Sequence, residues 1–548
     1  MSIYVNQTGY LTQKTKIAVS TLPCNFQLIR TSDQVCVFDG STKDLGIDAC
    51  SGEHTYEIDF SAVAEPGSYY LLAGNGDKSY TFVIQDHPYD QLKRDLIKAL
   101  YYQRCGCALE EEHAGIYTHK PCHTEPSIFL SDYLAGTPDP EGIDMTGGWH
   151  DAGDFGRYTS PGAVALAHLL YAYELFPKAL QDTLNIPETG NGIPDILNEC
   201  LYELNWLLKM QAPDGGVYHK LTSFCHADFV MPEDDHLQFL IFPVSSMSTA
   251  DFAAVMALAS RVYARLKPDF SAKALEAARK AWDWLEKNPY TGFANPEGSN
   301  TGVYDDDCDL DERLWASAEL LRTDCANTEA CEQYRRRLME YTDMVTAKTD
   351  FGWTDVSGFA SLSLLFDPKH CGGSQLEERY RQALLTEADR LLAIADHSPY
   401  RLAMQPEDFI WGSNMVVCNR SMLFILCSLL TEGEQARKYE SAALEQLHYL
   451  LGRNALDISY VTGHGENAFK NPHNRSTFAD GIELPMPGWV SGGPFKTPCD
   501  PAALEHIPEG TAPMKCYVDH VDSYSTNEIT IYWNSPAVFM TAFFDSLS

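Results

Sequence analysis

The pattern of hydrophobic and polar residues changes its period once along this chain. Before about residue 86, short runs rich in β-branched and aromatic residues alternate with turn signals such as Pro66-Gly67 and Gly74-Asn75-Gly76. This pattern is typical of β-strands. Strands are predicted at the start of the chain and over residues 17–20, 26–29, 35–38, 54–60, 68–73 and 79–84. Turn signals at this spacing indicate a small β-sandwich.

From Tyr89 onward the apolar residues recur with the period of a helix. Twelve helices are predicted, beginning near residues 89, 161, 193, 248, 271, 311, 328, 355, 375, 413, 434 and 535. Because we expect no strands between them, a doubly wound sheet is excluded, and the helices can form six hairpins that close into a ring. The predicted domains are a sandwich over residues 1–86 and a helical domain over residues 87–548. Four long loops, roughly 105–160, 212–247, 288–310 and 453–533, are expected to carry the functional site.

The charge of the chain excludes two classes of partner. Forty basic and 76 acidic side chains give a net charge of −36, which repels phosphate backbones and anionic membranes. No uncharged apolar run reaches the roughly 18 residues of a membrane span, and the first residues lack the basic and apolar regions of a signal peptide. The 16 cysteines mostly stand singly in apolar segments, which favours free thiols. We expect a cytoplasmic monomer, or a secreted protein if a signal peptide has been removed, that binds neither nucleic acid nor membranes.

A glycine-rich loop over residues 147–158 holds the closest grouping of potentially catalytic side chains in the sequence. Asp151 and Asp154 stand three residues apart in it, between Trp149 and Phe155. In isolation such a segment also suits a turn or a calcium loop. The functional interpretation is a carboxylate pair that activates water, in a cleft where aromatic faces stack on sugar rings.

A second cluster lies near the end of the chain, at residues 517–535, where Glu528 stands among Tyr524, Trp533 and other aromatic and amide residues. Partial desolvation raises the pKa of such a carboxyl group and suits it to act as a general acid near neutral pH. Between the two clusters, His473 and Arg475 can hydrogen-bond a polyhydroxylated ligand or tune nearby carboxylates. A base, an acid and a bound water are what hydrolysis of a glycosidic bond requires.

Four spaced motifs then follow one another in order. They are Tyr4-Val-Asn-Gln-Thr-Gly-Tyr10, Trp149-His-Asp151-Ala-Gly-Asp154, Pro472-His473-Asn474-Arg475 and the pattern from Tyr517 through Glu528 to Ser535. Together they resemble glycoside hydrolase family 9, the cellulase family E, in the form with an N-terminal immunoglobulin-like domain. The resemblance runs nearly end to end. It implies a mainly α fold class, in which a small all-β immunoglobulin-like sandwich precedes an (α/α)6 barrel that carries the catalytic site.

The resemblance also assigns roles to single residues. Asp154 resembles the general base of the family, Asp151 its partner in holding the nucleophilic water, and Glu528 the general acid. His473 and Arg475 match a substrate-contacting element, in which Asn474 stands where many relatives have a second histidine. Further residues are candidates for substrate-binding walls, although each also suits a packing role. These are Trp149, Tyr218, His219, Tyr304, Trp411 and Tyr524.

Two structural metal ions are expected. Cys105, Cys122, His123 and His150 offer two thiolates and two imidazoles, which suit tetrahedral Zn²⁺. Cys107 competes with Cys105 for this role, and the resemblance supports a structural zinc beside the active-site loop. An acid-rich segment after residue 300 resembles a calcium segment of the family and has the oxygen ligands that Ca²⁺ prefers, although an acidic solvated loop explains it as well. The predicted calcium ligands are Thr301, Gly302, Asp305, Asp311, Glu312 and Asp355.

The leading functional prediction is an inverting hydrolase of β-1,4-glucosidic bonds in soluble glucans and cellodextrins, that is, an endoglucanase or cellodextrinase. An exo-β-glucosaminidase acting on chitosan oligosaccharides is the alternative within this class. A non-catalytic carbohydrate-binding protein is the alternative from another class, and loss of a catalytic carboxylate would mark it. Because we expect no binding module after the barrel, soluble β-glucan or cello-oligosaccharide substrates are favoured over crystalline cellulose.

Overall fold

The computed structural model describes residues 3–324, 328–346 and 348–547. The chain folds into two units. The first unit comprises Met1–Ala99, Glu387–Thr477 and Gly481–Ser548, and the second comprises Leu100–Thr386 and Phe478–Asp480. The sandwich therefore shares a unit with the C-terminal helices.

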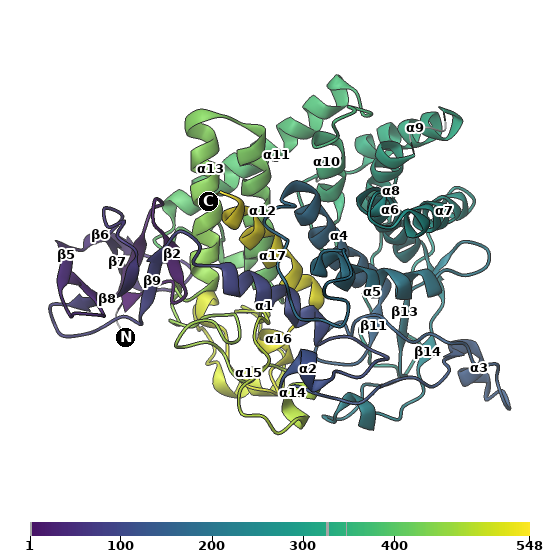
Figure 1. Ribbon diagram of the computed structural model, residues 1–548, viewed down its shortest axis with the longest axis horizontal. Coiled ribbons are helices and arrows are strands. Elements are labelled where there is room, and N and C mark those ends of the chain that lie inside the picture. Colours follow the sequence, from purple (N-terminus) through teal and green to yellow (C-terminus); the bar gives the residue numbers. More distant parts are fainter. Residues whose placement is uncertain (1–2, 325–327, 347, 548) are drawn as a thin grey trace. The chain divides into compact units, whose positions relative to one another are not determined.

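The predicted sandwich is present at the N-terminal end of the described chain, at the purple end of the colour scale in Figure 1. Its strands are β1 (Ile3–Tyr4), β2 (Gly9–Leu11), β3 (Ile17–Ser20), β4 (Asn25–Arg30), β5 (Cys36–Ser41), β6 (Lys43–Ile47), β7 (His54–Asp59), β8 (Gly67–Ala73) and β9 (Phe82–Gln85). They form two sheets, with strand orders β1-β3-β7-β6 and β2-β9-β8-β4-β5. Alternate residues of β8 are buried, and side chains such as Tyr10, Phe26, Ile58 and Phe82 form the core.

Strands β2 and β6 were not predicted. β2 has only three residues, all of them buried, so it shows no alternation between polar and apolar positions. In β6 the register against β7 shifts between Asp44 and Gly46, which interrupts the period of two that identifies a strand.

The helices of the first unit follow the sandwich and return at the end of the chain. They are α1 (Asp90–Tyr101), the second half of α11 (Ser374–His397), α12 (Ser413–Leu430), α13 (Gly433–Leu450), α15 (Pro501–His506), α16 (Tyr524–Asn527) and α17 (Ile531–Ser546), with α14 (Arg475–Ala479) at the unit boundary. α12 packs against α13 and α17. Among the described helices, α12 alone is long and apolar enough to cross a membrane, and 72% of it is buried, as in a helix of a protein core.

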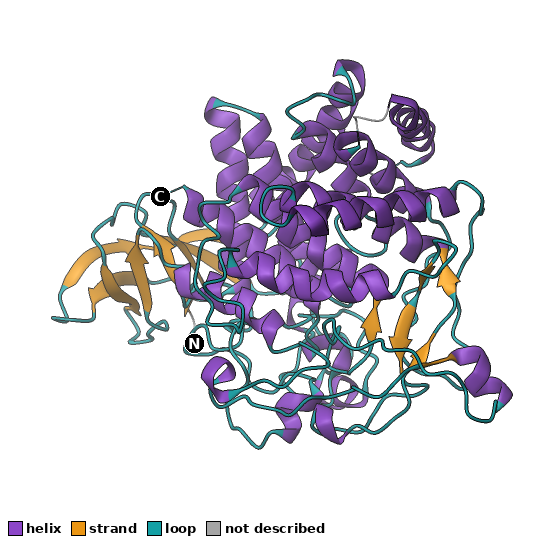
Figure 2. Ribbon diagram, turned by 45° about the vertical axis from the view of Figure 1, so that its right-hand side comes forward, coloured by secondary structure: helices purple, strands orange, loops and turns teal. Residues whose placement is uncertain are grey.

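The second unit contains, in its described part, the first half of α11 and seven longer helices: α4 (Thr159–Leu175), α5 (Asp195–Lys209), α6 (Ser246–Tyr263), α7 (Pro268–Leu285), α8 (Leu310–Thr323), α9 (Thr328–Met344) and α10 (Ser357–Leu365). It also contains the short helices α2 (Glu111–Ala114) and α3 (Leu130–Ala135). α4 and α6 are buried almost all round, and α5 leaves only a narrow stripe uncovered, whereas α7 and α9 bury one face. Helices that are buried on every side must be enclosed by others. Figure 2 shows the helices in purple and the strands in orange.

All twelve predicted helices have a counterpart, and the largest difference in starting point is at the last, predicted near residue 535 and found from Ile531. The prediction that no strands lie between the helices was wrong. Short strands occur in the loops of the second unit: β10 (Ile128–Phe129), β11 (Arg157–Tyr158), β12 (Val217–Tyr218), β13 (Lys220–Thr222), β14 (Leu240–Ile241) and β15 (Val244–Ser245). Two or three residues are too few to show a period of two. The sheet β10-β14-β13-β11 joins the loop before α4 to the loop before α6.

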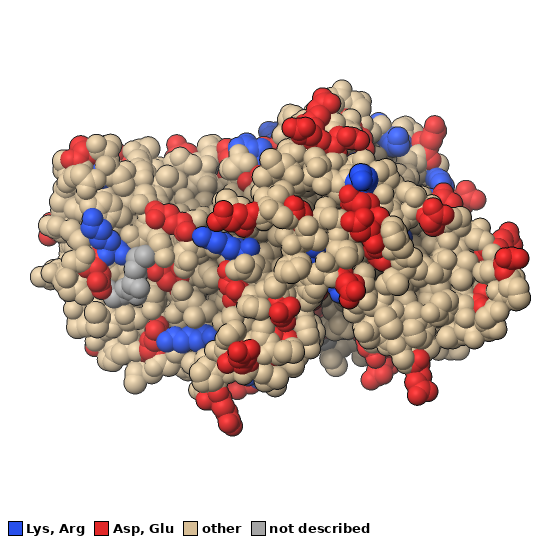
Figure 3. Space-filling model, turned by 90° about the horizontal axis from the view of Figure 1, so that it is seen from below, with Lys and Arg blue, Asp and Glu red and all other residues tan. Residues whose placement is uncertain are grey.

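The surface reflects the composition. On the face drawn in Figure 3, acidic side chains are scattered and basic side chains are fewer, in keeping with the net charge of −36. The cysteines in the described part of the chain are all free thiols.

Candidate active site

The loop that carries Asp151 and Asp154 is held in a tight turn. Gly148 has a φ of +79°, and a Cβ atom there would lie 2.7 Å from the Trp206 side chain, so the position favours glycine on two grounds. The Asp151 amide donates a hydrogen bond to the Gly156 carbonyl over 2.9 Å. The Gly156 amide in turn donates to Asp154 Oδ1 over 2.5 Å. The turn thus presents both carboxylates from one rigid segment.

Two glutamates of α5 hold the start of this loop. The Trp149 backbone amide donates to Glu203 Oε2 over 2.6 Å, and its indole Nε1 donates to Glu199 Oε1 over 2.8 Å. Residues four apart on a helix share a face, so α5 presents both acceptors to the same residue. Arg104 donates to both oxygens of Glu199, and burial raises the pKa of Glu203 to about 8.

Trp149 is therefore a packing residue, and the prediction that it forms a substrate-binding wall is corrected. Its side chain is 1% exposed, and both of its N–H groups are used by α5. An aromatic ring must expose a face to stack on a sugar, and Trp149 exposes none.

The two aspartates differ in their surroundings. Asp151 is buried, its Oδ2 accepts a hydrogen bond from the Tyr304 hydroxyl over 2.5 Å, and its Oδ1 has no hydrogen-bond partner in the described structure. Burial raises the pKa of Asp151 well above its usual range. Asp154 is more open, and its Oδ2 lies 3.6 Å from His226 Nδ1. Asp151 Oδ1 can therefore accept a hydrogen bond from a water molecule, and Asp154 is the more accessible of the two carboxylates.

His219 is the second corrected candidate. Its side chain is 2% exposed, and its ring lies 3.8 Å from the Phe293 ring in a stacked arrangement. Nδ1 is 2.9 Å from Ser245 Oγ, and Nε2 donates to the Val303 carbonyl over 2.7 Å. Burial lowers the pKa of His219 to about 3. A neutral imidazole with both nitrogens occupied holds the fold together and is not available to a substrate.

Tyr304 and Tyr218 remain candidates for substrate contact. Tyr304 packs edge-on against Tyr158 and Trp353, at ring distances of 4.8 and 5.1 Å, and its hydroxyl holds Asp151. Tyr218 is partly exposed, and its ring lies 5.7 Å from that of Phe129.

Glu528 lies in the first unit, directly after α16, and its backbone is held on two sides. The Gly492 amide donates to the Glu528 carbonyl over 2.8 Å, and His473 forms a parallel β-bridge with Glu528. His473 Nδ1 is 2.6 Å from the Val521 carbonyl, which assigns a proton to Nδ1. The predicted acid and the predicted substrate-contacting histidine are thus neighbours.

Asp519 and Asn527, which lie in the pattern from Tyr517 to Ser535 and were assigned no role from the sequence, hold these two segments together. The Asp519 carboxylate accepts from the amides of Lys470 and Asn471, each over 2.8 Å, and from Asn527 Nδ2 over 3.0 Å. The Tyr517 hydroxyl donates to Asn527 Oδ1. One carboxylate therefore fixes the chain just before His473 and the residue just before Glu528.

An aromatic surface adjoins His473. The Tyr524 ring lies 6.0 Å from the His473 ring, and Trp411 lies 5.5 Å from Tyr524 with 33° between the planes. Trp411 is 42% exposed, so it offers a face to a ligand. Arg475 begins α14 and is 6% exposed.

The predicted zinc ligands come together in the second unit. One ligand atom from each of Cys105, Cys122, His123 and His150 lies within 4.8 Å of the others. His123 Nδ1 is 3.5 Å from Cys105 Sγ and 3.4 Å from His150 Nε2. Burial opposes ionisation of Cys105, but the Cys122 thiol and nearby positive groups lower its pKa overall. Two buried thiols and two imidazoles fit a tetrahedral zinc ion, and Cys107 lies outside this group.

Asp235, another residue that was not singled out from the sequence, supports this cluster. Its Oδ2 is 3.2 Å from His123 Nε2, the arrangement that orients a metal-binding imidazole. His123 itself has a φ of +49°, a strained conformation for a non-glycine residue.

The predicted calcium ligands have other contacts. The buried Lys220 ammonium donates to Thr301 Oγ1 over 3.0 Å and to the Gly302 carbonyl over 2.6 Å. Asp311 accepts from the Val356 amide, and burial together with Asp355 raises its pKa to about 6. Both carboxylate oxygens of the buried Glu312 lack a partner in the described structure.

Asp305, Asp311, Glu312 and Asp355 do not form a group with ligand atoms within 4.8 Å of one another among the described residues. Calcium binding by this segment therefore stays a prediction.

Comparison with known proteins adds an independent observation. Residues 89–541 match the family described as Glycosyl hydrolase family 9, and residues 1–78 match the Cellulase N-terminal ig-like domain. The chain is 42% identical to a cellodextrinase of Butyrivibrio fibrisolvens over 550 residues, which cover 98% of each protein. A thermostable endoglucanase of Alicyclobacillus acidocaldarius, solved as a single mutant, is 36% identical with a TM-score of 0.91 over 99% of both chains. A Zn-binding triple mutant of the endoglucanase J30 is 32% identical with a TM-score of 0.89, over 97% of this chain and 99% of that one.

These similarities confirm the predicted fold class, a small immunoglobulin-like sandwich followed by a helical catalytic domain of the (α/α)6 type. The position of the boundary at residues 86–87 stays a prediction, although the change from strands to helices falls between Gln85 and Asp90.

Proposed function

This chain belongs to glycosyl hydrolase family 9 and hydrolyses β-1,4-glucans, and from this premise we propose that its substrates are cellodextrins and other soluble β-1,4-glucans, cleaved with inversion. The cellodextrinase that resembles it over 98% of its length supports the preference for short chains.

In the proposed reaction, Asp154 accepts a proton from water as the water oxygen attacks the anomeric carbon. Asp151, with Oδ2 held by Tyr304 and Oδ1 unpartnered in the described structure, accepts a hydrogen bond from the same water and orients it. Glu528 donates its proton to the glycosidic oxygen as that bond breaks, and the proton taken by Asp154 later returns to solvent. The observation that carries the proposal is this pair of unlike aspartates on one rigid turn.

Inversion is tested by the configuration of the first product. A direct displacement by water needs room between base and sugar, which is why inverting pairs stand roughly 6.5–9.5 Å apart, against about 5–5.5 Å for retaining pairs. Proton NMR during hydrolysis of cellotetraose should show the α-anomer before mutarotation. Accumulation of the β-anomer would contradict the assignment.

Zinc is proposed as a structural ion at Cys105, Cys122, His123 and His150. Four protein ligands leave no open position for a reacting water. When bound, the ion would supply a fixed cross-link, because His150 directly precedes Asp151 in the catalytic turn. A zinc-binding variant of a related endoglucanase supports the choice of metal. Structural calcium near Asp311 and Glu312 is proposed on the buried, unpartnered Glu312 carboxylate.

The glucosaminidase alternative is not favoured, since the relatives described above are a cellodextrinase and endoglucanases. A cationic Arg475 near the 2-position would also repel the ammonium group of glucosamine. The two functions are separated by comparing turnover of cellotetraose with that of chitosan tetramer. Faster turnover of the chitosan tetramer would overturn the proposed substrate.

A further inference from the structure

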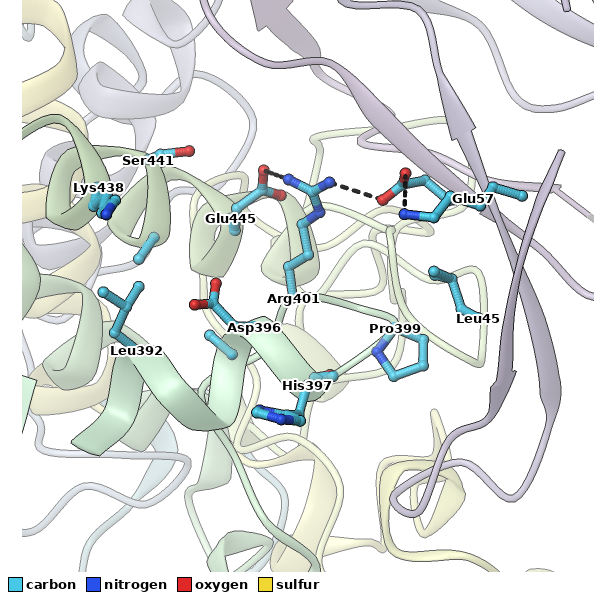
Figure 4. A pocket seen from close by; sticks show the side chains of 14 residues that line it. Leu45, Glu57, Leu392, Asp396, His397, Pro399, Arg401, Lys438, Ser441 and Glu445 are labelled. Carbon is cyan, nitrogen blue, oxygen red and sulfur yellow. Dashed lines mark hydrogen bonds and ion pairs between the residues drawn. The ribbon is translucent and has the colours of Figure 1, made fainter. Parts of the chain in front are cut away.

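A cavity of about 560 Å³ lies within the first unit, between the sandwich and two long helices (Figure 4). One wall comes from β6 and β7, and the other comes from the end of α11, the loop after it and α13. None of the residues assigned above to catalysis, substrate contact or metal binding lines it. Its volume is in the range of small-molecule sites, roughly 300–1,000 Å³.

Arg401 forms the centre of the cavity wall. Its guanidinium is 2.7 Å from Glu57 Oε2 of the sandwich and 3.6 Å from Glu445 Oε1 of α13, as the dashed lines in Figure 4 show. The residue has a φ of +51°, which is uncommon outside glycine. Its amide donates to Ser398, and its carbonyl accepts from Gln446. The backbone hydrogen bonds therefore fix the position of Arg401, and the two ion pairs orient its guanidinium.

Other polar groups of the wall are available to a ligand. Asp396, near the end of α11, is exposed and has no hydrogen bond or ion pair in the described structure. Ser441 contributes a hydroxyl group from α13, and Lys438 contributes an ammonium group that also pairs with Glu434 over 3.0 Å. Leu45, Leu392 and Pro399 add apolar patches between these groups (Figure 4).

The balance of charge narrows the class of ligand. The lining contains three carboxylates, Glu57, Asp396 and Glu445, and three cationic groups, Lys43, Arg401 and Lys438. The carboxylates and the overall charge of −36 repel an anion, and the three basic groups repel a cation. An apolar ligand would have to remove water from all six charged side chains, which costs free energy. A neutral molecule with many hydroxyl groups can donate to the carboxylates and accept from the basic groups at once.

We propose that this cavity is a non-catalytic binding site for a neutral short saccharide, with hydroxyl groups held by Asp396, Arg401 and Ser441 and C–H faces resting on Leu45 and Pro399. The choice of β-1,4-linked glucose units, and so of cellobiose as the probe, rests on the proposed function. The sandwich would then take part in ligand binding, because two residues of its strands, Lys43 and Glu57, line the cavity.

Titration calorimetry of cellobiose into the full-length Glu528→Gln protein, which does not consume the ligand, tests this proposal. Asp396→Ala removes a hydroxyl acceptor without breaking any described contact, and we expect about tenfold weaker binding at this site, the effect of one hydrogen bond to a charged group. Ser441→Phe fills the cavity, and the same binding event should disappear. Asp283→Ala, a change at an exposed aspartate of α7, is the matched control and should leave the isotherm unchanged.

An isotherm that is the same in all four proteins overturns the site. Binding of citrate or spermidine that is lost in Ser441→Phe, in the absence of cellobiose binding, overturns the ligand class. The proposed function is judged separately, by hydrolysis of cellotetraose by the unmodified chain and by Asp396→Ala, both of which should be equally active. If either protein is inactive, that result counts against the proposed function and not against the cavity, because the lining of the cavity holds no catalytic residue.

Discussion

The turn that carries Asp151 and Asp154 and the segment that carries Glu528 are held in place by different means. On the base side, ionisable side chains hold the chain: Glu199 and Glu203 bind Trp149, and a cluster of thiols and imidazoles adjoins Asp151. On the acid side, the backbone of Glu528 pairs with that of its neighbours, and Asp519 accepts three N–H groups.

This difference predicts different sensitivities. A turn held by buried acids and metal ligands depends on their protonation and on the ion, because both change the charge that the surroundings must accommodate. A segment held by backbone pairing and by one carboxylate that is not a metal ligand does not depend on the ion. The base side should therefore respond to metal removal and to the protonation of Glu203, while the acid side should respond mainly to changes in Glu528 and in Asp519, which binds backbone amides on that side.

The largest effects are expected at the two carboxylates themselves. Asp154→Asn and Glu528→Gln should each lower turnover of cellotetraose by about 10³-fold, a typical loss on removing a general base or acid. With an aryl cellobioside whose leaving group needs no proton, Glu528→Gln should regain most of its rate, whereas Asp154→Asn should not. Steady-state kinetics on both substrates measure this contrast, and equal recovery by the two variants would reverse the assigned roles.

Loss of the metal should lower the thermal stability of the protein through the base side and not through the acid side. Cys122→Ser should lose bound zinc, and its melting temperature should fall by roughly 10 °C or more, because a structural site contributes directly to folding. Asp519→Asn, the control on the acid side, should keep its zinc. Elemental analysis and thermal unfolding of both proteins are the measurements. If the purified protein contains no zinc, the predicted zinc site is wrong. If the melting temperature does not change after complete metal removal, the ion does not stabilise the catalytic turn.

Most of the fold could be predicted from the sequence, because the apolar residues of the long helices recur with a strong helical period. All twelve were anticipated, whereas the two-residue strands β10 and β11 were not, since a pattern needs several residues to show its period. Motif spacing brought out the carboxylates and the four zinc ligands.

The supporting residues were missed because their roles depend on contacts across the fold. Glu199 and Glu203 lie about 50 residues from Trp149 in sequence, and in α5 they read as two acids on an ordinary amphipathic helix. Trp149 and His219 were assigned to substrate for the converse reason, because a sequence shows that an aromatic residue adjoins a site but not whether its ring is buried.

A smaller effect is expected from Glu203, which tests whether protonation matters on the base side. Its pKa is about 8 in the folded protein because of burial, against about 4.3 when unfolded. Between these values the folded state binds the extra proton, so the free energy of unfolding should fall as pH rises from about 4.5 to 8. Glu203→Gln, which keeps an acceptor for the Trp149 amide and cannot ionise, should lose this decline. Urea unfolding at pH 5 and pH 8 should show the difference, a few kcal/mol, and parallel pH profiles would refute it.

The smallest effects are expected at two tryptophans, Trp149 on the base side and Trp411 on the acid side. Trp149→Phe keeps the packing but leaves Glu199 without its indole donor, so unfolding free energy should fall by about 1–3 kcal/mol. Trp411→Ala removes an exposed ring beside Tyr524, so KM for cellotetraose should rise about three- to tenfold, corresponding to roughly 0.5–1.5 kcal/mol of aromatic contact, with stability unchanged. Urea unfolding and steady-state kinetics on both variants give the comparison. If Trp149→Phe instead raised KM with stability intact, the buried indole would have to reach the substrate after all, and the turn that presents Asp151 would be less rigid than its hydrogen bonds to α5 indicate.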